Sequence, residues 1–171
     1  ITSKNAELLF RIVRYFQPKS VLEIGTSLGL ATSALSLGNK NAQIITLEGC
    51  PNTIATAKKM FQVSSFKFPN NNVQFLNTEF NLYFENFKPE TLNLKPQIFD
   101  LVYFDGNHSK KATLDYFEAL LPTISNDSVW IFDDIHWSAD MEEAWEIIKK
   151  TLLSKQHFHN HKKSSKSFRY D

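Results

Sequence analysis

The stretch that most constrains the fold of this chain lies near its start, at residues 20–37. It reads SVLEIGTSLGLATSALSL, in which an apolar run ending at Ile24 meets Gly25, and a helix-favouring run follows Gly29. This order predicts a strand, a tight turn and the first turn of a helix. Glycine lets the backbone approach a ligand closely, and the unpaired N–H groups of a helix start favour a carboxylate or a phosphate. The stretch therefore predicts a site for a small anionic group.

The spacing of the glycines separates two classes of ligand that use such a turn. A dinucleotide site needs the pattern G-x-G-x-x-G to bring the backbone against a pyrophosphate, whereas this chain offers Gly25 and Gly29 after an acidic Glu23. The spacing argues against a dinucleotide and is compatible with S-adenosylmethionine. Two glycines can occur in any turn between a strand and a helix, so the later segments have to support this interpretation.

Length and charge set further limits. The chain has 171 residues, enough for one domain with a sizeable core. Its net charge of +1 creates no global field that would attract nucleic acid or a membrane surface, so we expect neither partner. The single Cys50 excludes an internal disulfide, and the sequence has no recognisable leader or membrane-spanning run. We therefore expect a cytoplasmic protein.

Strands and helices alternate along the sequence. Periodicity and turn residues predict strands at 21–24, 43–47, 72–76, 98–104 and 128–132, and helices at 4–16, 30–35, 53–62, 79–87, 109–121 and 139–153. The alternation predicts an α/β fold: a single domain with a Rossmann-like, doubly wound, mostly parallel sheet flanked by helices. We place this domain at residues 1–153. The continuous apolar character of 98–104 predicts a strand in the middle of the sheet.

The apolar residues of two predicted helices are assigned to the core. On the first helix they are Leu8, Leu9, Ile12, Val13 and Phe16. On the helix at 79–87 they are Phe80, Tyr83, Phe84 and Phe87, which we assign to the core rather than to a stacking platform. The basic residues 154–171 form a predicted tail, either poorly ordered or part of an incomplete terminal strand pair, to which we assign no chemistry.

Polar residues follow the predicted strands at the edge where open α/β sheets bind ligands. Glu48 follows Gly25 by 23 positions, the separation at which an acid after the second strand accepts the hydroxyls of a ribose; the alternative is an exposed loop glutamate. Asn77 either contacts an adenine edge or closes the third strand as a turn residue. Asp105, Asp133 and Asp134 follow the fourth and fifth strands and are predicted to converge.

Four motifs in this order resemble the class I S-adenosylmethionine-dependent methyltransferases. They are VLEIGTSLG, ITLEGCP, DLVYFDGNH and WIFDDIHW, and the resemblance spans residues 4–153. Within that class they are most similar to the O-methyltransferase branch, which includes catechol O-methyltransferase-like enzymes and their small bacterial relatives. The resemblance implies methyl transfer from S-adenosylmethionine to a hydroxyl of a small-molecule acceptor. It also implies a cofactor site made of Glu23, Gly25, Thr26, Ser27, Gly29, Glu48, Gly49, Asn77 and Asp105.

The resemblance also implies a catalytic centre, from which this chain departs at two positions. Metal-dependent members hold Mg²⁺ at the positions of Asp105, Asp133 and Asp134, but they usually have Asp-Asn where this chain has Asp133-Asp134, and three carboxylates are more than Mg²⁺ normally takes from protein. Many members have a lysine three positions beyond the first aspartate, where this chain has His108. His108 is then either the base that takes the acceptor proton, with Asp105 beside it, or a cap of the next helix. The Asp pair binds metal, or it caps and supports the last helix, or one aspartate does each.

Other assignments stay open at this point. His136 and Trp137 line an acceptor pocket, or Trp137 is instead buried against the sheet. The same motifs fit a metal-independent N- or carboxyl-methyltransferase, and they fit a non-catalytic domain that binds the cofactor or a partner. A homodimer is also left open.

Overall fold

The computed structural model describes residues 1–63, 72–85 and 98–159, with the backbone alone for 63 and 154–159. In these residues the elements follow the order α1 (Ser3–Phe16), β1 (Ser20–Ile24), α2 (Leu30–Gly38), β2 (Gln43–Glu48), α3 (Pro51–Val63), β3 (Val73–Asn77), α4 (Phe80–Glu85), β4 (Leu101–Phe104), α5 (Lys110–Leu120), the 3-10 helix η2 (Leu121–Thr123), β5 (Val129–Phe132) and α6 (Ala139–His159). The predicted alternation of strands and helices is confirmed.

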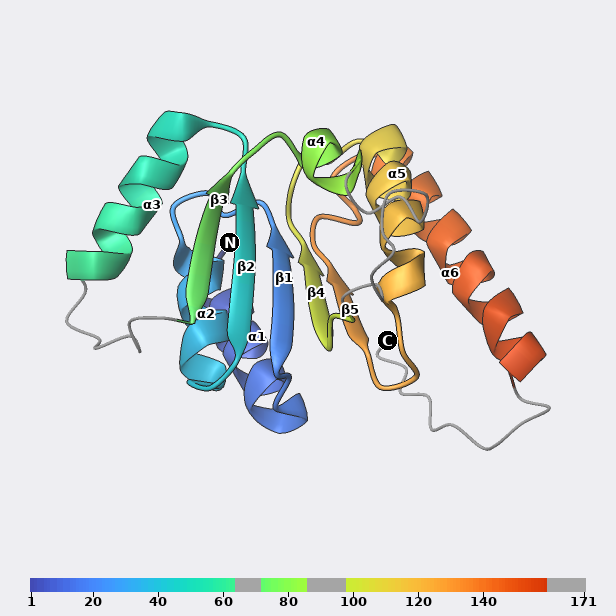
Figure 1. The fold of residues 1–171 in the computed structure, drawn as a ribbon. Coiled ribbons are helices and arrows are strands. Elements are labelled where there is room, and N and C mark those ends of the chain that lie inside the picture. The colour runs from blue at the N-terminus through green and yellow to red at the C-terminus, as the bar shows by residue number, and fades with distance from the viewer. Residues whose placement is uncertain (64–71, 86–97, 160–171) are drawn as a thin grey trace.

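The described strands form one parallel sheet in the order β3-β2-β1-β4-β5 (Figure 1). β1 is central, and the chain winds first toward β3 and then, from β4, toward β5. The loops after β1 and β4 therefore diverge, and such a switch point opens a crevice at the carboxyl ends of the strands. β4 lies between β1 and β5, which confirms its predicted interior position.

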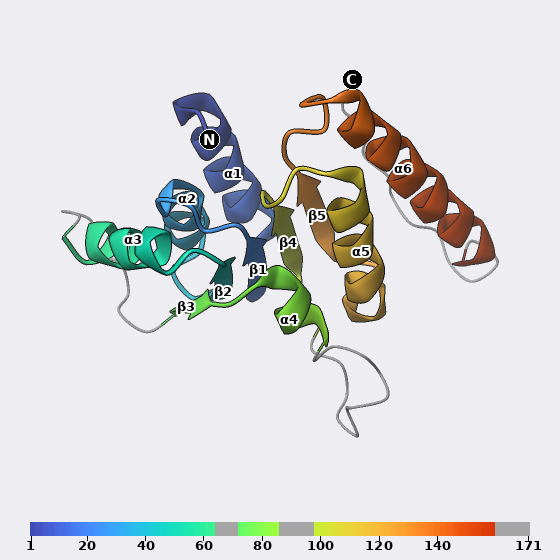
Figure 2. The ribbon, with the colours of Figure 1, turned by 90° about the horizontal axis from the view of Figure 1, so that it is seen from above.

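Helices cover both faces of the sheet, with α1, α2 and α3 on one side and α4, α5 and α6 on the other (Figure 2). Alternate strand residues fill the two resulting cores, as the period of two along a strand requires. On β4, Leu101 and Tyr103 belong to the core under α1 and α2, whereas Val102 and Phe104 belong to the core under α4 and α5. The predicted doubly wound α/β fold is thereby confirmed.

The face of α1 that packs on the sheet differs from the predicted one. Leu9 and Val13 are buried, but Leu8 is 56% exposed and Phe16 is 49% exposed, so the assignment of these two residues to the core is wrong. The rotation of α1 is set by its close approach to the end of α2. A Cβ on Gly38 would lie 2.7 Å from the Cβ of Val13, a spacing that only glycine permits.

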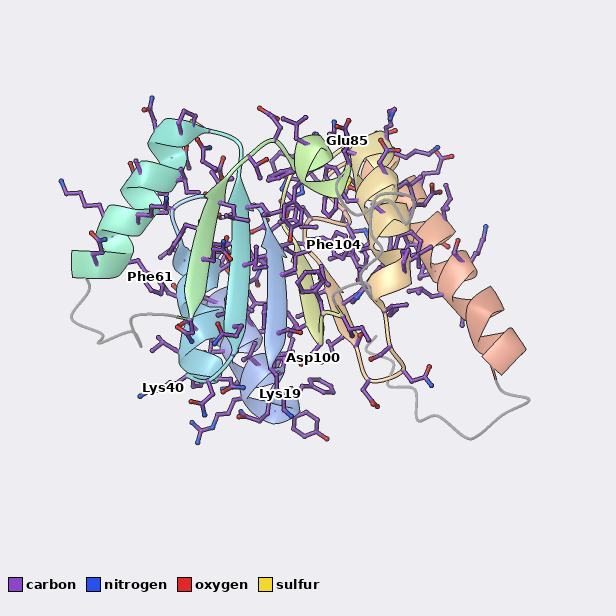
Figure 3. The ribbon with its side chains drawn as sticks, viewed as in Figure 1. Lys19, Lys40, Phe61, Glu85, Asp100 and Phe104 are labelled. Carbon is purple, nitrogen blue, oxygen red and sulfur yellow. The ribbon has the colours of Figure 1, made fainter. Side chains whose placement is uncertain are left out.

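Two element ends also differ from the predictions. β4 begins at Leu101 rather than at residue 98, because the carboxylate of Asp100 accepts hydrogen bonds from the backbone N–H groups of Lys19 (2.7 Å) and Ser20 (3.1 Å). This contact ties the amino ends of β1 and β4 together, and Figure 3 shows Lys19 and Asp100 at that edge. α6 continues to His159, beyond its predicted end at 153, so the predicted tail begins in helix; residues 160–171 lie outside the described residues.

The aromatic residues of α4 lie where they were predicted. Phe84 is buried, and Phe80 and Tyr83 pack against the same core, so their assignment to the core is confirmed; Phe87 lies outside the described residues. Among the helices that the structure describes, none has the length and apolar character needed to cross a membrane.

Candidate functional site

The glycine turn after β1 lies against the backbone of the loop after β4. Gly25 has a φ of 101°, and a Cβ on this residue would lie 2.2 Å from the carbonyl oxygen of Asp105. The N–H groups of Gly25 and Thr26 donate to the carbonyl of Leu47, at 3.0 and 2.9 Å. The turn is therefore held from both sides by main-chain contacts, which requires glycine at position 25.

Glu23 lies under this turn and is fully buried. Its Oε2 accepts a hydrogen bond from the hydroxyl of Thr32 at 2.6 Å, while its Oε1 has no hydrogen-bond partner among the described residues. Burial raises the pKa of this carboxyl from 4.5 to about 8, so it holds its proton at neutral pH. Beside it, the hydroxyls of Thr26 and Thr46 share a buried hydrogen bond of 2.6 Å.

Glu48 ends β2 with its carboxylate turned toward the glycine turn. Its Oε2 accepts from the N–H of Ser27 and its Oε1 accepts from the N–H of Cys50, both at 3.0 Å. Ser27 has a left-handed φ of 48°, which directs its N–H to the carboxylate. Each carboxylate oxygen can accept more than one hydrogen bond, so the group keeps acceptor capacity at a fixed position. Glu48 is thus not a free loop glutamate.

Asn77 ends β3 next to Glu48. Its side-chain amide donates to the backbone carbonyls of Glu48 (2.8 Å) and Gly49 (3.2 Å). These bonds tie the ends of β2 and β3 together, which is the turn role considered for Asn77. The Asn77 residue is exposed.

Asp105, His108 and Asp134 meet beyond the ends of β4 and β5. The Nε2 atom of His108 lies 3.7 Å from Oδ1 of Asp105 and 3.4 Å from Oδ2 of Asp134. One ligand atom from each of the three side chains lies within 4.8 Å of the other two. Burial, and then the charge of Asp133, raises the pKa of Asp105 from 3.8 to about 6. The three predicted residues Asp105, His108 and Asp134 are brought together here.

Asp133 lies beside this group with a different partner. Its Oδ2 accepts a hydrogen bond of 2.5 Å from the hydroxyl of Tyr103, and its Oδ1 accepts from the N–H of Asp134 at 3.0 Å. Within the described residues, the ligand atoms that lie close together thus come from two carboxylates and an imidazole, while the metal set of Asp105, Asp133 and Asp134 stays a prediction.

The capping alternatives for these residues do not hold. The side chain of Ser109, not of His108, caps α5 by accepting from the N–H of Ala112. At the start of α6, the N–H of Met141 donates to the hydroxyl of Ser138. Trp137 is 71% exposed, so it is not packed on the sheet, and His136 contacts Glu142 on the surface at 3.0 Å.

Residues 22–135 match the model of a family described as a methyltransferase domain. The chain belongs to this family. No curated protein sequence matches the methyltransferase chain.

Several solved structures share the fold of this methyltransferase. The O-methyltransferase from Bacillus cereus, solved in complex with SAH (S-adenosylhomocysteine), has a TM-score of 0.72 at 19% identity, covering 90% of this chain and 70% of that chain. TomG from Streptomyces achromogenes, an O-methyltransferase involved in tomaymycin synthesis and solved with SAM (S-adenosylmethionine), has a TM-score of 0.68 at 18% identity, with the same coverage of both chains. SAH-bound PaMTH1 from Podospora anserina has a TM-score of 0.68 at 20% identity, again with 90% and 70% coverage. At these identities the similarity establishes the fold of the methyltransferase.

Three residues of the methyltransferase site were missed from the sequence. Thr32, Thr46 and Tyr103 all contact predicted site residues. Thr46 and Tyr103 lie within the motifs ITLEGCP and DLVYFDGNH, but the motifs gave neither residue a role. The parallel register places Thr46 and Tyr103 on either side of Glu23. Pairing the predicted strands in register would have found these two residues, whereas Thr32 comes from the packing of α2.

Proposed function

We propose that this methyltransferase transfers the methyl group of S-adenosylmethionine to a hydroxyl of a small molecule. The proposal is supported by the family, by the SAH and SAM bound to the B. cereus and S. achromogenes proteins, and by the arrangement of Glu48 and His108. The decisive observation is that a fixed carboxylate contacts one end of the glycine turn, at Ser27, while the other end, at Gly25, lies against the loop that carries the imidazole of His108. The carboxylate is suited to a ribose and the imidazole to an acceptor proton.

The residues around the turn fit the donor. Glu48 is held by two backbone N–H groups and retains acceptor capacity for the two ribose hydroxyls. The turn residues Gly25, Thr26, Ser27 and Gly29 and the loop residue Gly49 would line the donor, with Asn77 at the adenine end. Glu23 has a buried, unpartnered oxygen beneath the turn, where it could accept from the methionine end. When bound, S-adenosylmethionine supplies a methyl group that its sulfonium already activates.

His108 is assigned the role of proton acceptor. Its side chain is 25% exposed, and its Nε2 lies 3.7 and 3.4 Å from two carboxylate oxygens, farther than in a well-formed hydrogen bond, so the imidazole is oriented without being fully engaged. A hydroxyl placed there gives its proton to Nε2 as its oxygen takes the methyl group, and Asp105 and Asp134 stabilise the resulting imidazolium.

The same cluster offers ligands for a divalent cation. Ligand atoms bound at about 2.1 Å to one octahedral ion lie roughly 3.0 to 4.2 Å apart, and the two distances from His108 fall in that range. The set of two carboxylates and one imidazole nitrogen suits a transition metal better than Mg²⁺, which prefers oxygen ligands. A bound cation would supply positive charge for the ionised acceptor oxygen. It would occupy His108, so the two uses of the cluster predict opposite effects of a chelator.

Calorimetric titration with S-adenosylhomocysteine tests the donor site. We expect micromolar binding that Glu48→Gln weakens by about 1.5–3 kcal/mol, the scale of charge-assisted hydrogen bonds. Glu7→Gln is a matched control, because Glu7 pairs with Arg11 on the exposed side of α1. Absence of binding to the folded wild-type protein would contradict the proposal.

Methyl transfer from radiolabelled S-adenosylmethionine tests the chemistry, with catechol and a set of simple phenols, alcohols, amines and carboxylic acids as probe acceptors. We expect incorporation into hydroxylated acceptors, with a loss of about 10²- to 10⁴-fold in His108→Gln, the usual contribution of a general base. His136→Gln is the control, since His136 lies on the surface beside Glu142. Transfer to amines or carboxylic acids alone would replace O-methylation by the metal-independent alternative.

A further inference from the structure

We propose that Tyr103 is a positioning residue of this site: its hydroxyl holds Asp133 away from His108, so that the imidazole faces Asp105 and Asp134 only. This inference rests on the role proposed for His108. It concerns a residue that no sequence motif singles out.

The geometry of Tyr103 is fixed by the sheet. Its ring is 2% exposed and belongs to the core under α1 and α2, in register with Glu23 on one side and Ile131 on the other. A side chain buried in this way cannot change rotamer without opening the core. Its hydroxyl therefore reaches the carboxyl edge of the sheet at a fixed place, 2.5 Å from Oδ2 of Asp133, where it also interacts with the side chain of Asp105.

The second oxygen of Asp133 is also occupied. The N–H of Asp134 donates to Oδ1 at 3.0 Å, so both oxygens of Asp133 are engaged within the loop after β5. Asp134 itself has a left-handed φ of 53°, an uncommon conformation for a residue other than glycine or asparagine, and its Oδ2 lies 3.4 Å from His108. Two adjacent aspartates are thereby separated, one bound to Tyr103 and the other directed to His108.

This separation matters because of how His108 is used. Its Nε2 lies 3.7 Å from Asp105 and 3.4 Å from Asp134, farther than in a well-formed hydrogen bond, and in this role it accepts from a substrate hydroxyl. A third carboxylate free to move would form a direct hydrogen bond with that nitrogen and occupy it. The hydroxyl of Tyr103 prevents this contact by holding Asp133 through one hydrogen bond.

The acylation of histidine by diethyl pyrocarbonate tests the proposal without a methyl acceptor, because the reagent needs a free ring nitrogen. The rate at His108 is measured by peptide mass spectrometry relative to His136 in the same sample, a surface residue paired with Glu142. The variants are Tyr103→Phe, which removes only the hydroxyl, and Tyr103→Phe with Asp133→Asn. Tyr83→Phe is the matched control, since it removes a phenolic hydroxyl from α4 on the other face of the sheet.

We expect Tyr103→Phe to slow acylation of His108 about threefold or more, the effect of one added hydrogen bond, while the double variant and Tyr83→Phe keep the wild-type rate. An unchanged rate of acylation of His108 in Tyr103→Phe would overturn the inference. Faster acylation of both His108 and His136 would also overturn it, because it would mean that the variant is more flexible as a whole. If Tyr103→Phe does not fold, Asp133→Asn alone decides: the wild-type rate supports the inference and a change of about threefold or more refutes it.

Titration of the same proteins with S-adenosylhomocysteine separates this inference from the proposed function. We expect all variants to bind it as the wild type does. Loss of binding in Tyr103→Phe alone would mean that Tyr103 acts on the donor site and would overturn the inference. Absence of binding in the wild type would refute the proposed function, while the acylation rates would still decide the role of Tyr103.

Discussion

Gly25→Ala is expected to disrupt the site more than Gly29→Ala or Gly49→Ala. Three of the four glycines at this edge of the sheet form a graded series; the fourth, Gly106, is set apart because a Cβ on it would meet the ring of Phe80 at 2.6 Å. At Gly49 a Cβ would meet only the Glu79 carboxylate at 3.6 Å, at Gly29 it would have room but a φ of 80°, and at Gly25 it would combine a φ of 101° with a 2.2 Å approach to the carbonyl oxygen of Asp105. Gly49→Ala therefore tests added volume alone, Gly29→Ala tests backbone strain, and Gly25→Ala tests strain combined with steric overlap.

The magnitudes follow from these geometries. Gly49→Ala is expected to change the free energy of unfolding by no more than about 0.5 kcal/mol, as ordinary surface substitutions do. Gly29→Ala is expected to cost about 1–2 kcal/mol for the left-handed backbone alone. Gly25→Ala adds an overlap with main-chain atoms that cannot rotate away, and we expect a loss of about 3–5 kcal/mol, which corresponds to roughly 10 °C in melting temperature for a chain of this size.

Urea unfolding at a fixed pH measures the three free energies, and titration with S-adenosylhomocysteine measures the donor site in each variant. We expect Gly25→Ala to lose binding even where it remains folded, because relief of the overlap must separate the turn from the loop that carries Asp105. A Gly25→Ala protein no less stable than Gly29→Ala would refute the reasoning, since the contact with the carbonyl of Asp105 would then not be restrictive.

Three further predictions follow from burial and charge. Because burial raises the pKa of Glu23 from 4.5 to about 8, the folded protein holds a proton that the unfolded chain releases, so the free energy of unfolding should fall as the pH rises between about 4.5 and 8. Glu23→Gln should flatten this slope in urea unfolding. Equal slopes in the variant and the wild type would contradict the burial argument. Leu9→Ala should cost about 2–5 kcal/mol, whereas Leu8→Ala, one position away on the exposed side of α1, should cost about 0.5 kcal/mol or less in the same assay, and equal losses would mean that α1 packs differently. Treatment with EDTA should leave methyl transfer unchanged if His108 takes the proton directly, and should abolish it, with recovery on adding Mn²⁺, if the cluster holds a cation.

The fold could be predicted because its signals are local. The run from Val21 to Gly29 specifies a strand, a turn and a helix start within nine residues, and the acids at 48, 105 and 133 follow apolar runs long enough to be strands. Once the strands are parallel, their carboxyl ends share one edge, so the candidate residues had to be neighbours. The rotation of α1 was not local information, because it depends on the contact between Gly38 and Val13.

The roles of the individual acids could not be predicted in the same way. Asp133 and Asp134 are adjacent and chemically identical, and their separation depends on a tyrosine from another strand and on a left-handed φ at Asp134. Sequence order gives the edge on which a side chain lies, but not which of two neighbouring carboxylates turns toward His108. That choice is made by tertiary hydrogen bonds, to which periodicity and spacing are insensitive.

The backbone contact between the glycine turn and the loop after β4 has a consequence for the tolerance of the site to change. The backbone of Gly25 lies directly against the backbone of Asp105. The distance from the glycine turn to Asp105 is therefore set by the pairing of β1 with β4. Substitutions in either core can repack side chains without altering that pairing. Sequence changes in the hydrophobic core can therefore accumulate without altering the alignment that methyl transfer needs. Changes in the surrounding loops can alter which acceptor binds while the reacting geometry stays the same.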